Sequence, residues 1–437
     1  MNDLSVEIFR ATVFHTPRNP FHEPHALVDF EDGALAVQDG RIAQCGGYSE
    51  AQAAYPEATV RDLRGRFILP GFVDTHVHFP QGRILGGLGF TLLDWLERLA
   101  LPEEARLADA DYAVTIANEF VSALAAHGTT TALVFGSHFA PAVAALFEAA
   151  AGRGLRVVSG LVMSDRNLRP ELYQSPEAAL RDSCELLKRF HGKQRLSYAV
   201  MPRFALSASE AMLESCRALL SAHPEARFTT HINENADEVE AVRKLFPWAA
   251  DYLAVYERYG LVGPRSVLAH NVHADDEELQ RLSVYRASIA HCPSSNAALG
   301  SGIFPMARHV ASDVPFALGT DVGGGTGFGM MKEALAAYLI QRIASAPLIL
   351  VPATMLYLAT RAGAEALGME EETGDFTARK SADFVIIDPP AGGVLEARLK
   401  CTETPDQVLA ALFTLGGPES ISEVRVGGDV VFQRKKR

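Results

Sequence analysis

The sequence predicts an α/β fold, a (β/α)8 barrel of the TIM type, with a small β-sandwich domain built from both ends of the chain. Eight short apolar runs rich in Val, Ile, Leu, Phe and Thr follow one another through the middle of the chain, as strands buried on both faces do. Amphipathic segments separate most of these runs, and an alternation of strands with helices is typical of a parallel barrel. Shorter alternating runs with turn signals near both ends indicate the second, smaller domain.

The predicted barrel strands are short, and polar residues follow several of them. We expect these strands at residues 67–73, 129–135, 156–163, 195–201, 227–230, 266–269, 287–290 and 314–318. Helices with one apolar face are expected at residues 140–151, 176–190, 209–221, 275–282, 331–343 and 352–367.

The flanking segments show strand-like alternation at residues 33–42, 382–388 and 424–432. We expect the two ends of the chain to pair outside the barrel. The predicted domains are residues 1–66 for the first part of the β-sandwich, 67–369 for the metal-dependent catalytic barrel and 370–437 for the second part of the β-sandwich.

The composition and net charge indicate which kinds of partner the protein binds and in which compartment it is expected. The chain of 437 residues has a formal net charge of −13, with 48% hydrophobic and 21% charged residues, which is ordinary for a soluble globular protein. Nucleic acids and anionic membranes favour a basic face, so neither is expected as a partner, and a small neutral or cationic substrate fits better. Five scattered cysteines without a Cys-x-x-Cys pair indicate reduced thiols and a cytoplasmic location.

His76 and His78 follow the first predicted strand with one residue between them. In an extended backbone, residues i and i+2 point to the same face, so the two imidazoles can bind one metal ion. A His-x-His pair alone is weak evidence, because Zn²⁺ needs three or four protein ligands.

Three further candidate ligands occur where later predicted strands end, as His76 and His78 do for the first strand. His231 follows the fifth strand, His270 the sixth and Asp321 the eighth. Catalytic residues of such barrels come from the carboxyl ends of several strands, so we expect these side chains to meet His76 and His78. Nitrogen and oxygen ligands suit Zn²⁺, with Fe²⁺ as the alternative, and Asp321 is also expected close to the metal-bound water.

Glu234 is predicted to be catalytic. A bound metal lowers the pKa of water from about 15.7 towards 7, and expulsion of an amine also needs a group that carries protons to the leaving nitrogen. Glu234 lies three residues after His231, within reach of both. The alternative is a surface glutamate at a helix start, since residues 235–239 have a helix-start pattern.

These residues together resemble the amidohydrolase superfamily, and more closely the guanine deaminases within it. The general signature is Pro70-Gly71-Phe72-Val73-Asp74-Thr75-His76-Val77-His78 with the later histidines and Asp321. The narrower features are Phe79-Pro80-Gln81, Leu92-Leu93-Asp94-Trp95-Leu96, Pro202-Arg203-Phe204-Ala205, His231-Ile232-Asn233-Glu234-Asn235 and Cys292-Pro293-Ser294-Ser295-Asn296. The chain departs from the family at Leu99-Ala100-Leu101-Pro102, where a His-Thr-Phe-Pro segment is often found, which affects one pocket wall or a dimer contact.

The resemblance implies a hydrolase of purine metabolism that converts guanine to xanthine and ammonia. Metal-bound hydroxide would attack C2 of guanine, and Glu234 would pass a proton to a ring nitrogen. Arg203 would hold the O6/N7 edge with its bidentate fork, and Gln81 would bind the remaining edge. Phe204 and Trp95 would close the pocket. The predicted fourth strand ends without a lysine, so one metal ion is expected, and the family implies a homodimer.

Two other functions remain open from the sequence. One is a deaminase or chlorohydrolase acting on another heterocycle, such as 8-oxoguanine or an s-triazine. The other is a non-catalytic scaffold, which the presence of all five predicted ligands disfavours. His273 and His291 are expected close to the site without binding the ion.

Overall fold

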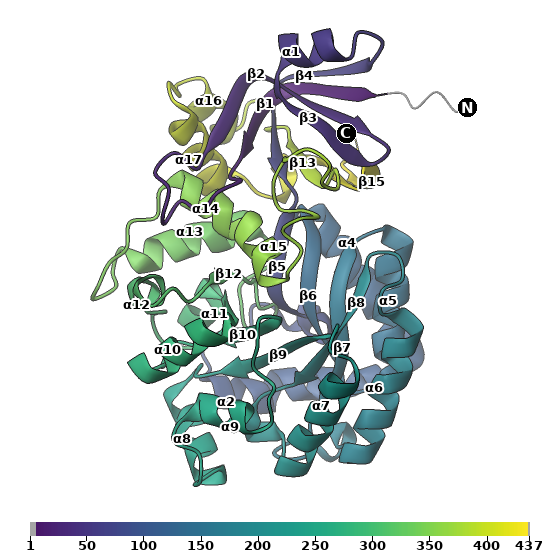
Figure 1. The fold of residues 1–437 in the computed structure, drawn as a ribbon, viewed down its shortest axis with the longest axis vertical. Coiled ribbons are helices and arrows are strands. Elements are labelled where there is room, and N and C mark those ends of the chain that lie inside the picture. The colour runs from purple at the N-terminus through teal and green to yellow at the C-terminus, as the bar shows by residue number, and fades with distance from the viewer. Residues whose placement is uncertain (1–5, 436–437) are drawn as a thin grey trace.

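Two sheets organise the computed structural model, which describes residues 6–435 (Figure 1). The first is an eight-stranded parallel sheet with its strands in chain order, from β5 at one edge to β12 at the other. Its strands are β5 (Phe72–His78), β6 (Thr129–Ser137), β7 (Arg156–Met163), β8 (Leu196–Pro202), β9 (Arg227–Ile232), β10 (Ser266–His270), β11 (Ser288–His291) and β12 (Phe316–Leu318). The predicted barrel strands are thus confirmed in number and order.

The two edges of this sheet come together into a nearly closed barrel. The backbone N–H of Asp321 donates to His76 O at 2.8 Å, and the N–H of His78 donates to Val322 O at 3.0 Å. These bonds join β5 to the segment that follows β12. The side chain of Asp321 is therefore brought next to the histidines of the first barrel strand.

Helices follow the barrel strands and cover the outside of the barrel (Figure 1). Their ends carry the expected capping residues: Ser175 caps α6, and Asn235 and Asp275 form capping boxes at α8 and α10. The short helices α2 (Leu92–Trp95) and α3 (Leu101–Ala105) follow β5, and the later helices are α4 (Ala110–Ala126), α5 (Ala140–Arg153), α6 (Pro176–Phe190), α7 (Glu210–Ala222), α8 (Ala236–Leu245), α9 (Tyr252–Arg258), α10 (Asp276–Tyr285), α11 (Pro293–Ala298), α12 (Met306–Ala311), α13 (Met330–Gln341), α14 (Pro352–Ala359) and α15 (Arg361–Ala366).

The second sheet has seven strands and is built from both ends of the chain. Its order is β15 (Asp429–Gln433), β14 (Ile421–Val426), β13 (Phe384–Ile387), β4 (Thr59–Pro70), β1 (Glu7–His15), β2 (Val28–Gln38) and β3 (Arg41–Gly47). The short helices α1 (Tyr48–Ala54), α16 (Val394–Leu399) and α17 (Pro405–Leu415) belong to the same two chain ends. The predicted fold class is confirmed. The domain limits at 66/67 and 369/370 stay a prediction, and residues 1–5 and 436–437 of the predicted end segments lie outside the described residues.

The predicted strand at residues 67–73 is wrong as a single barrel strand. Phe67 to Pro70 belong to β4 and pair with β13 in the second sheet, whereas β5 begins at Phe72. Gly71 stands between them, where a Cβ atom would lie 2.2 Å from Thr130 Oγ1. Because both sheets bury this run, its apolar pattern is continuous and hides the change of sheet.

The helix predicted at residues 352–367 is interrupted. Thr360 has φ −134° and ψ −88°, outside the helical region, and separates α14 from α15. Its hydroxyl donates to Leu356 O at 2.6 Å, while its carbonyl accepts from Ala364 N at 3.2 Å. Thr360 therefore ends one helix and begins the next, which the composition of the segment does not reveal.

A large apolar core runs through the barrel and the inner faces of its helices, and includes Phe72, Val77, Phe135, Leu161 and Phe228. Within residues 6–435, no helix is both long and apolar enough to cross a membrane.

Candidate active site

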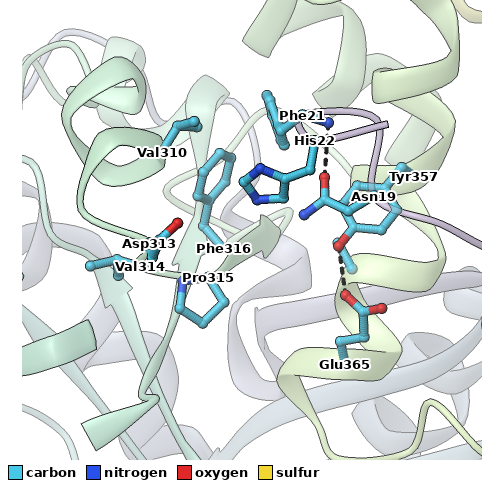
Figure 2. Close-up of a pocket in the computed structure, with 11 residues that line it drawn as sticks. Asn19, Phe21, His22, Val310, Asp313, Val314, Pro315, Phe316, Tyr357 and Glu365 are labelled. Atoms are coloured by element: carbon cyan, nitrogen blue, oxygen red, sulfur yellow. Dashed lines mark hydrogen bonds between the residues drawn. The ribbon is translucent and has the colours of Figure 1, made fainter. Parts of the chain in front are cut away.

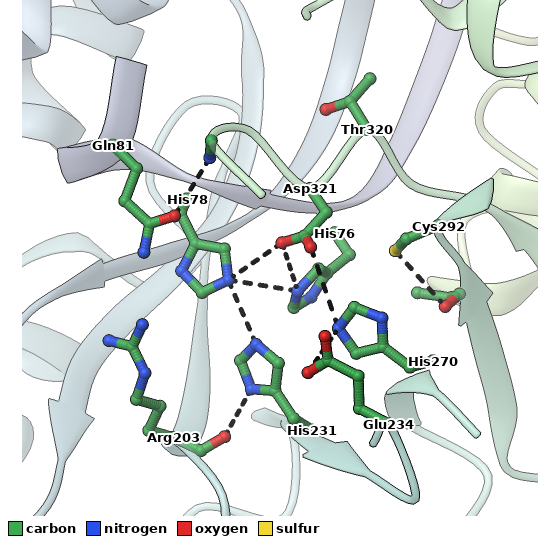
Figure 3. A network of polar contacts seen from close by, with 12 residues as sticks. His76, His78, Gln81, Arg203, His231, Glu234, His270, Cys292, Thr320 and Asp321 are labelled. Carbon is green, nitrogen blue, oxygen red and sulfur yellow. Dashed lines mark hydrogen bonds and ion pairs between the residues drawn. The ribbon is translucent and has the colours of Figure 1, made fainter. Parts of the chain in front are cut away.

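The five predicted ligands converge at the carboxyl end of the barrel (Figure 3). His76 and His78 come from β5, His231 from β9, His270 ends β10, and Asp321 lies three residues after the end of β12. His78 Nε2 lies 3.2 Å from His76 Nε2 and 3.2 Å from His231 Nε2. Asp321 Oδ1 lies 3.3 Å from the Nε2 atoms of both His76 and His78. The extended strand therefore presents both of its imidazoles to one point, as predicted.

The ring orientations leave nitrogen lone pairs facing this point. His231 Nδ1 donates to Arg203 O at 2.6 Å, and His270 Nδ1 donates to Asn296 Oδ1 at 2.9 Å. These bonds place the proton on Nδ1 and leave Nε2 free to bind a metal ion. His270 Nε2 is buried and has no hydrogen-bond partner among the described residues. A buried, unpaired nitrogen of this kind fits a ligand for a cation.

The protonation states also suit metal ligands. Burial lowers the pKa of the histidines, to about 4 for His78 and well below the ordinary value for His231, so the imidazoles are neutral at neutral pH. Burial opposes ionisation of Asp321, but its contacts with His76 and His78 outweigh it and hold the pKa of Asp321 well below its usual range. Neutral imidazoles and an ionised carboxylate are the forms that bind a metal.

The donor set fits one divalent ion. Ligand atoms of His76, His231, His270 and Asp321 all lie within 4.8 Å of one another, and His78 joins them through the contacts above. Nitrogen and carboxylate donors in this number are typical of Zn²⁺ and Fe²⁺ sites.

Asp74 holds the first strand and the Asp321 segment in register. Its buried carboxylate accepts from Thr320 N at 3.0 Å, from Thr320 Oγ1 at 2.5 Å and from His76 N at 3.2 Å. Burial raises the pKa of Asp74 to about 7. Asp74 was not among the predicted site residues. Its place two residues before His76 in the histidine motif was the signal that could have indicated a role.

Glu234 lies beside the cluster and not on the surface. Its side chain is buried, with Oε2 at 3.5 Å from His270 Nε2 and Oε1 at 3.5 Å from Ser301 Oγ. Burial raises the pKa of Glu234 well above its ordinary value. Glu234 directly precedes Asn235, the N-cap of α8, so it does stand at a helix start. Its carboxyl group nevertheless faces the cluster. It can hold or release a proton next to the predicted ligands.

A small cavity adjoins the cluster. Glu234 and Asp321 are the two acidic residues among those that line it within the described chain, and Arg203 is the one basic side chain there besides the histidines. The other lining residues are His78, Gln81, Leu92, Trp95, Leu96, Phe204, His231, His270 and Leu299. All four predicted substrate-binding residues therefore reach this space.

An apolar wall closes one side of the cavity. Leu92 and Trp95 of α2 (Leu92–Trp95), followed by Leu96, pack with Phe204 and Leu299 in a small cluster of buried residues. A planar, uncharged ligand suits such a wall.

Behind the polar wall lies Glu104, a buried residue to which the sequence assigned no role. Arg203 Nη1 donates to Glu104 Oε1 at 2.6 Å and to Glu104 Oε2 at 2.7 Å. Gln81 Nε2 also donates to Glu104 Oε1, at 2.8 Å, while Gln81 Oε1 accepts from Gly323 N at 3.0 Å. Both partners of the Arg203–Glu104 ion pair are buried.

His273 and His291 lie outside the cluster. His273 Nε2 donates to Ser301 O at 2.8 Å, so it supports the residue that contacts Glu234. The buried ring of His291 stacks on Phe304 at 4.4 Å between centroids, and its nitrogens have no partner among the described residues.

A second pocket lies at the opposite end of the barrel (Figure 2). Val314, Pro315 and Phe316 at the amino end of β12 line it together with Phe21 and Tyr357. Tyr357 Oη donates to Glu365 Oε2 at 2.5 Å there. This face of a barrel contributes to stability and not to catalysis, so the cluster at the carboxyl end is the candidate active site.

Comparison with known proteins gives full-length similarities. A model of the amidohydrolase family matches residues 67–431, and a model of the imidazolonepropionase-like composite domain of bacteria matches residues 33–58. The probable guanine deaminase of Deinococcus radiodurans is 57% identical over 436 residues, which cover 98% of this chain and 99% of that protein.

Solved structures are also similar to this chain over nearly its full length. The E. coli guanine deaminase has a TM-score of 0.95 at 37% sequence identity, and the match covers 98% of this chain and 100% of that one. The guanine deaminase from C. acetobutylicum, solved with guanine bound in its active site, has a TM-score of 0.90 at 25% identity, with 98% of this chain and 100% of that one covered.

Proposed function

The chain belongs to the amidohydrolase family and, within it, to the guanine deaminases, and we propose that its candidate active site hydrolyses guanine to xanthine and ammonia. The observation that carries this function is the meeting of Glu234 with the histidine–aspartate cluster at a cavity that Arg203, Gln81, Phe204 and Trp95 also line. Guanine bound in the related structure from C. acetobutylicum supports guanine as the substrate.

The metal ligands that we propose are His76, His78, His231, His270 and Asp321, holding one Zn²⁺ ion, with Fe²⁺ as the alternative. Their convergence and the unpaired Nε2 of His270 support this assignment. When bound, the ion supplies a Lewis acid that makes water nucleophilic near neutral pH.

Glu234 is the proton carrier in this proposal. As water attacks C2 of guanine, the ionised Glu234 accepts a proton and passes it to a ring nitrogen of the purine. Its buried position and raised pKa support this role, because a group that both takes and gives a proton works best with a pKa near the ambient pH. Asp321, the second carboxylate at the cavity, is available for the proton that must reach the amine before ammonia leaves.

Arg203, Gln81, Phe204 and Trp95 bind the base. The Nε and Nη2 atoms of Arg203 have no protein hydrogen bond in the described chain and form the bidentate edge that suits O6 and N7 of guanine. Gln81 lies beside this edge, on the same side of His78 (Figure 3). Phe204 and Trp95 provide the apolar wall.

The test is incubation of the purified, metal-loaded protein with guanine while xanthine and ammonia are measured. Release of both in equal amounts is expected. Absence of both from a fully metal-loaded preparation would refute the proposed function.

The chain is also proposed to act as a cytoplasmic homodimer in guanine catabolism. The five cysteines are all unpaired, which supports a reducing compartment. Leu339, Ile343, Ile349 and Val351 expose apolar side chains around the end of α13, as expected for a surface that a second copy covers. Sedimentation of the purified protein as a monomer at micromolar concentration would contradict the dimer.

A further inference from the structure

Glu104 is a buried carboxylate that the proposed reaction does not use. It lies on α3 (Leu101–Ala105), two residues after the segment in which the chain departs from the family pattern, and its side chain is 3% exposed. Its two oxygens accept hydrogen bonds from Arg203 and Gln81, which are the two polar residues proposed to bind the substrate. His138 Nδ1 lies 3.6 Å from the same carboxylate. One anionic group is thus shared by the whole polar wall of the cavity.

The bonds to Glu104 determine which donors remain for a ligand. Both oxygens of Glu104 bind the same Arg203 nitrogen, Nη1, so the parallel Nε–H and Nη2–H bonds remain directed elsewhere. Gln81 is held at both ends, since Nε2 donates to Glu104 and Oε1 accepts from Gly323 N. These two bonds exclude the flipped orientation of the amide, which would place an oxygen against the carboxylate.

The charge of Glu104 also keeps Arg203 in the wall. The guanidinium side chain is 4% exposed and Glu104 is its one acidic partner within hydrogen-bond distance among the described residues. A buried ion pair contributes little to stability compared with apolar residues of the same volume. A pair kept at the edge of a binding cavity is therefore better explained by the orientation that it imposes.

We propose that Glu104 is a positioning residue, which orients the Nε–Nη2 edge of Arg203 and the amide of Gln81 for a purine that carries a 6-oxo group. The inference rests on the proposed function and extends it to substrate selection. Glu104 itself donates no hydrogen bond and is not among the residues lining the cavity, so it acts through Arg203 and Gln81.

The chain offers a matched control in Glu103. This neighbour is also buried, but its carboxylate binds Arg106 at 2.9 Å and the hydroxyl of Tyr112, away from the cavity. Glu103→Gln and Glu104→Gln therefore make the same chemical change on adjacent residues of one helix, and only the second touches the polar wall.

The experiment measures kcat and KM for guanine, together with binding of hypoxanthine, which has the 6-oxo group, and of purine, which lacks it. For Glu104→Gln, we expect kcat/KM for guanine and the affinity for hypoxanthine to fall on the order of 100-fold, because the Arg203 edge is misplaced. Purine affinity and metal content should stay close to those of the parent protein, whereas the thermal midpoint should fall because the buried charge of Arg203 loses its partner. Glu103→Gln should leave kcat/KM for guanine, both ligand affinities and the metal content unchanged.

Crystal structures of Glu104→Gln and Glu104→Ala provide a readout that does not depend on turnover. We expect Arg203 and Gln81 to leave their positions in at least the alanine variant. Unchanged positions in both variants, or equal losses for hypoxanthine and purine, would overturn the inference. If the parent protein releases no xanthine from guanine, the proposed function fails, and the ligand affinities and the structures still decide the role of Glu104.

Discussion

Replacing Glu234 by Gln removes the proposed proton carrier and keeps the shape of its side chain. The structure indicates that no neighbour can replace it. Asp321, the other acidic residue that lines the cavity in the described chain, contacts His76 and His78 and is assigned the proton that reaches the amine. The carboxyl group of Glu234 lies 3.5 Å from the Nε2 atom of His270 and 3.5 Å from the hydroxyl of Ser301.

The expected loss follows from this isolation. General acid–base groups contribute about 10²- to 10⁴-fold to rate. Because Asp321 is assigned the other proton transfer, we expect the upper part of this range, a fall in kcat of roughly 10³- to 10⁴-fold, which equals about 4 to 5.5 kcal/mol of transition-state stabilisation. The metal content should not change, because Glu234 is not among the predicted ligands.

The assay follows xanthine formation from guanine in the metal-loaded variant, with the metal measured in the same sample. Glu333→Gln is the matched control, since burial also raises the pKa of Glu333, to about 8, while its carboxyl group accepts from Ser294 N and Oγ outside the cavity. We expect the control to keep its activity. A Glu234→Gln enzyme with a nearly normal kcat and a full complement of metal would refute the proton-transfer role.

Three further outcomes are expected. Arg203→Ala should lower kcat/KM on guanine more than on a heterocycle without the O6/N7 edge, with an additional loss of transition-state stabilisation of about 1–3 kcal/mol. An equal loss on both substrates would contradict the assigned contact. Removal of the metal with a chelator should abolish activity, and re-addition of Zn²⁺ or Fe²⁺ should restore it. His270→Ala should bind too little metal for re-addition to restore activity. An active, metal-free enzyme would exclude the proposed cluster as the catalytic centre. Burial lowers the pKa of His15 to about 4, so below about pH 6.5 the unfolded chain binds a proton that the folded chain does not bind. Between pH 7.5 and 5, the free energy of unfolding of the parent protein should therefore fall by about 2 kcal/mol more than that of His15→Gln. Identical pH profiles of urea denaturation for these two proteins would disprove that contribution.

The barrel and the gathering of the candidate site residues at its carboxyl end were predictable from the sequence. A run of buried strands and helices has a periodic apolar pattern, and ligands at strand ends must meet because parallel strands end at one face. His76 and His78 were predictable as a pair since alternate residues of a strand share a face, and the observed distance of 3.2 Å between their Nε2 atoms agrees with this.

The points at which strands change partners and the support of the polar wall are visible only in the folded chain. The run at residues 67–73 crosses from one sheet to the other at Gly71, and a pattern of burial does not reveal which neighbour buries a residue. Glu104 and Arg203 are separated by 99 residues in the chain, and Glu104 lies on the five-residue helix α3, which is too short to carry a periodic signal. Pairing between such positions depends on the path of a loop in space, because no local propensity encodes it.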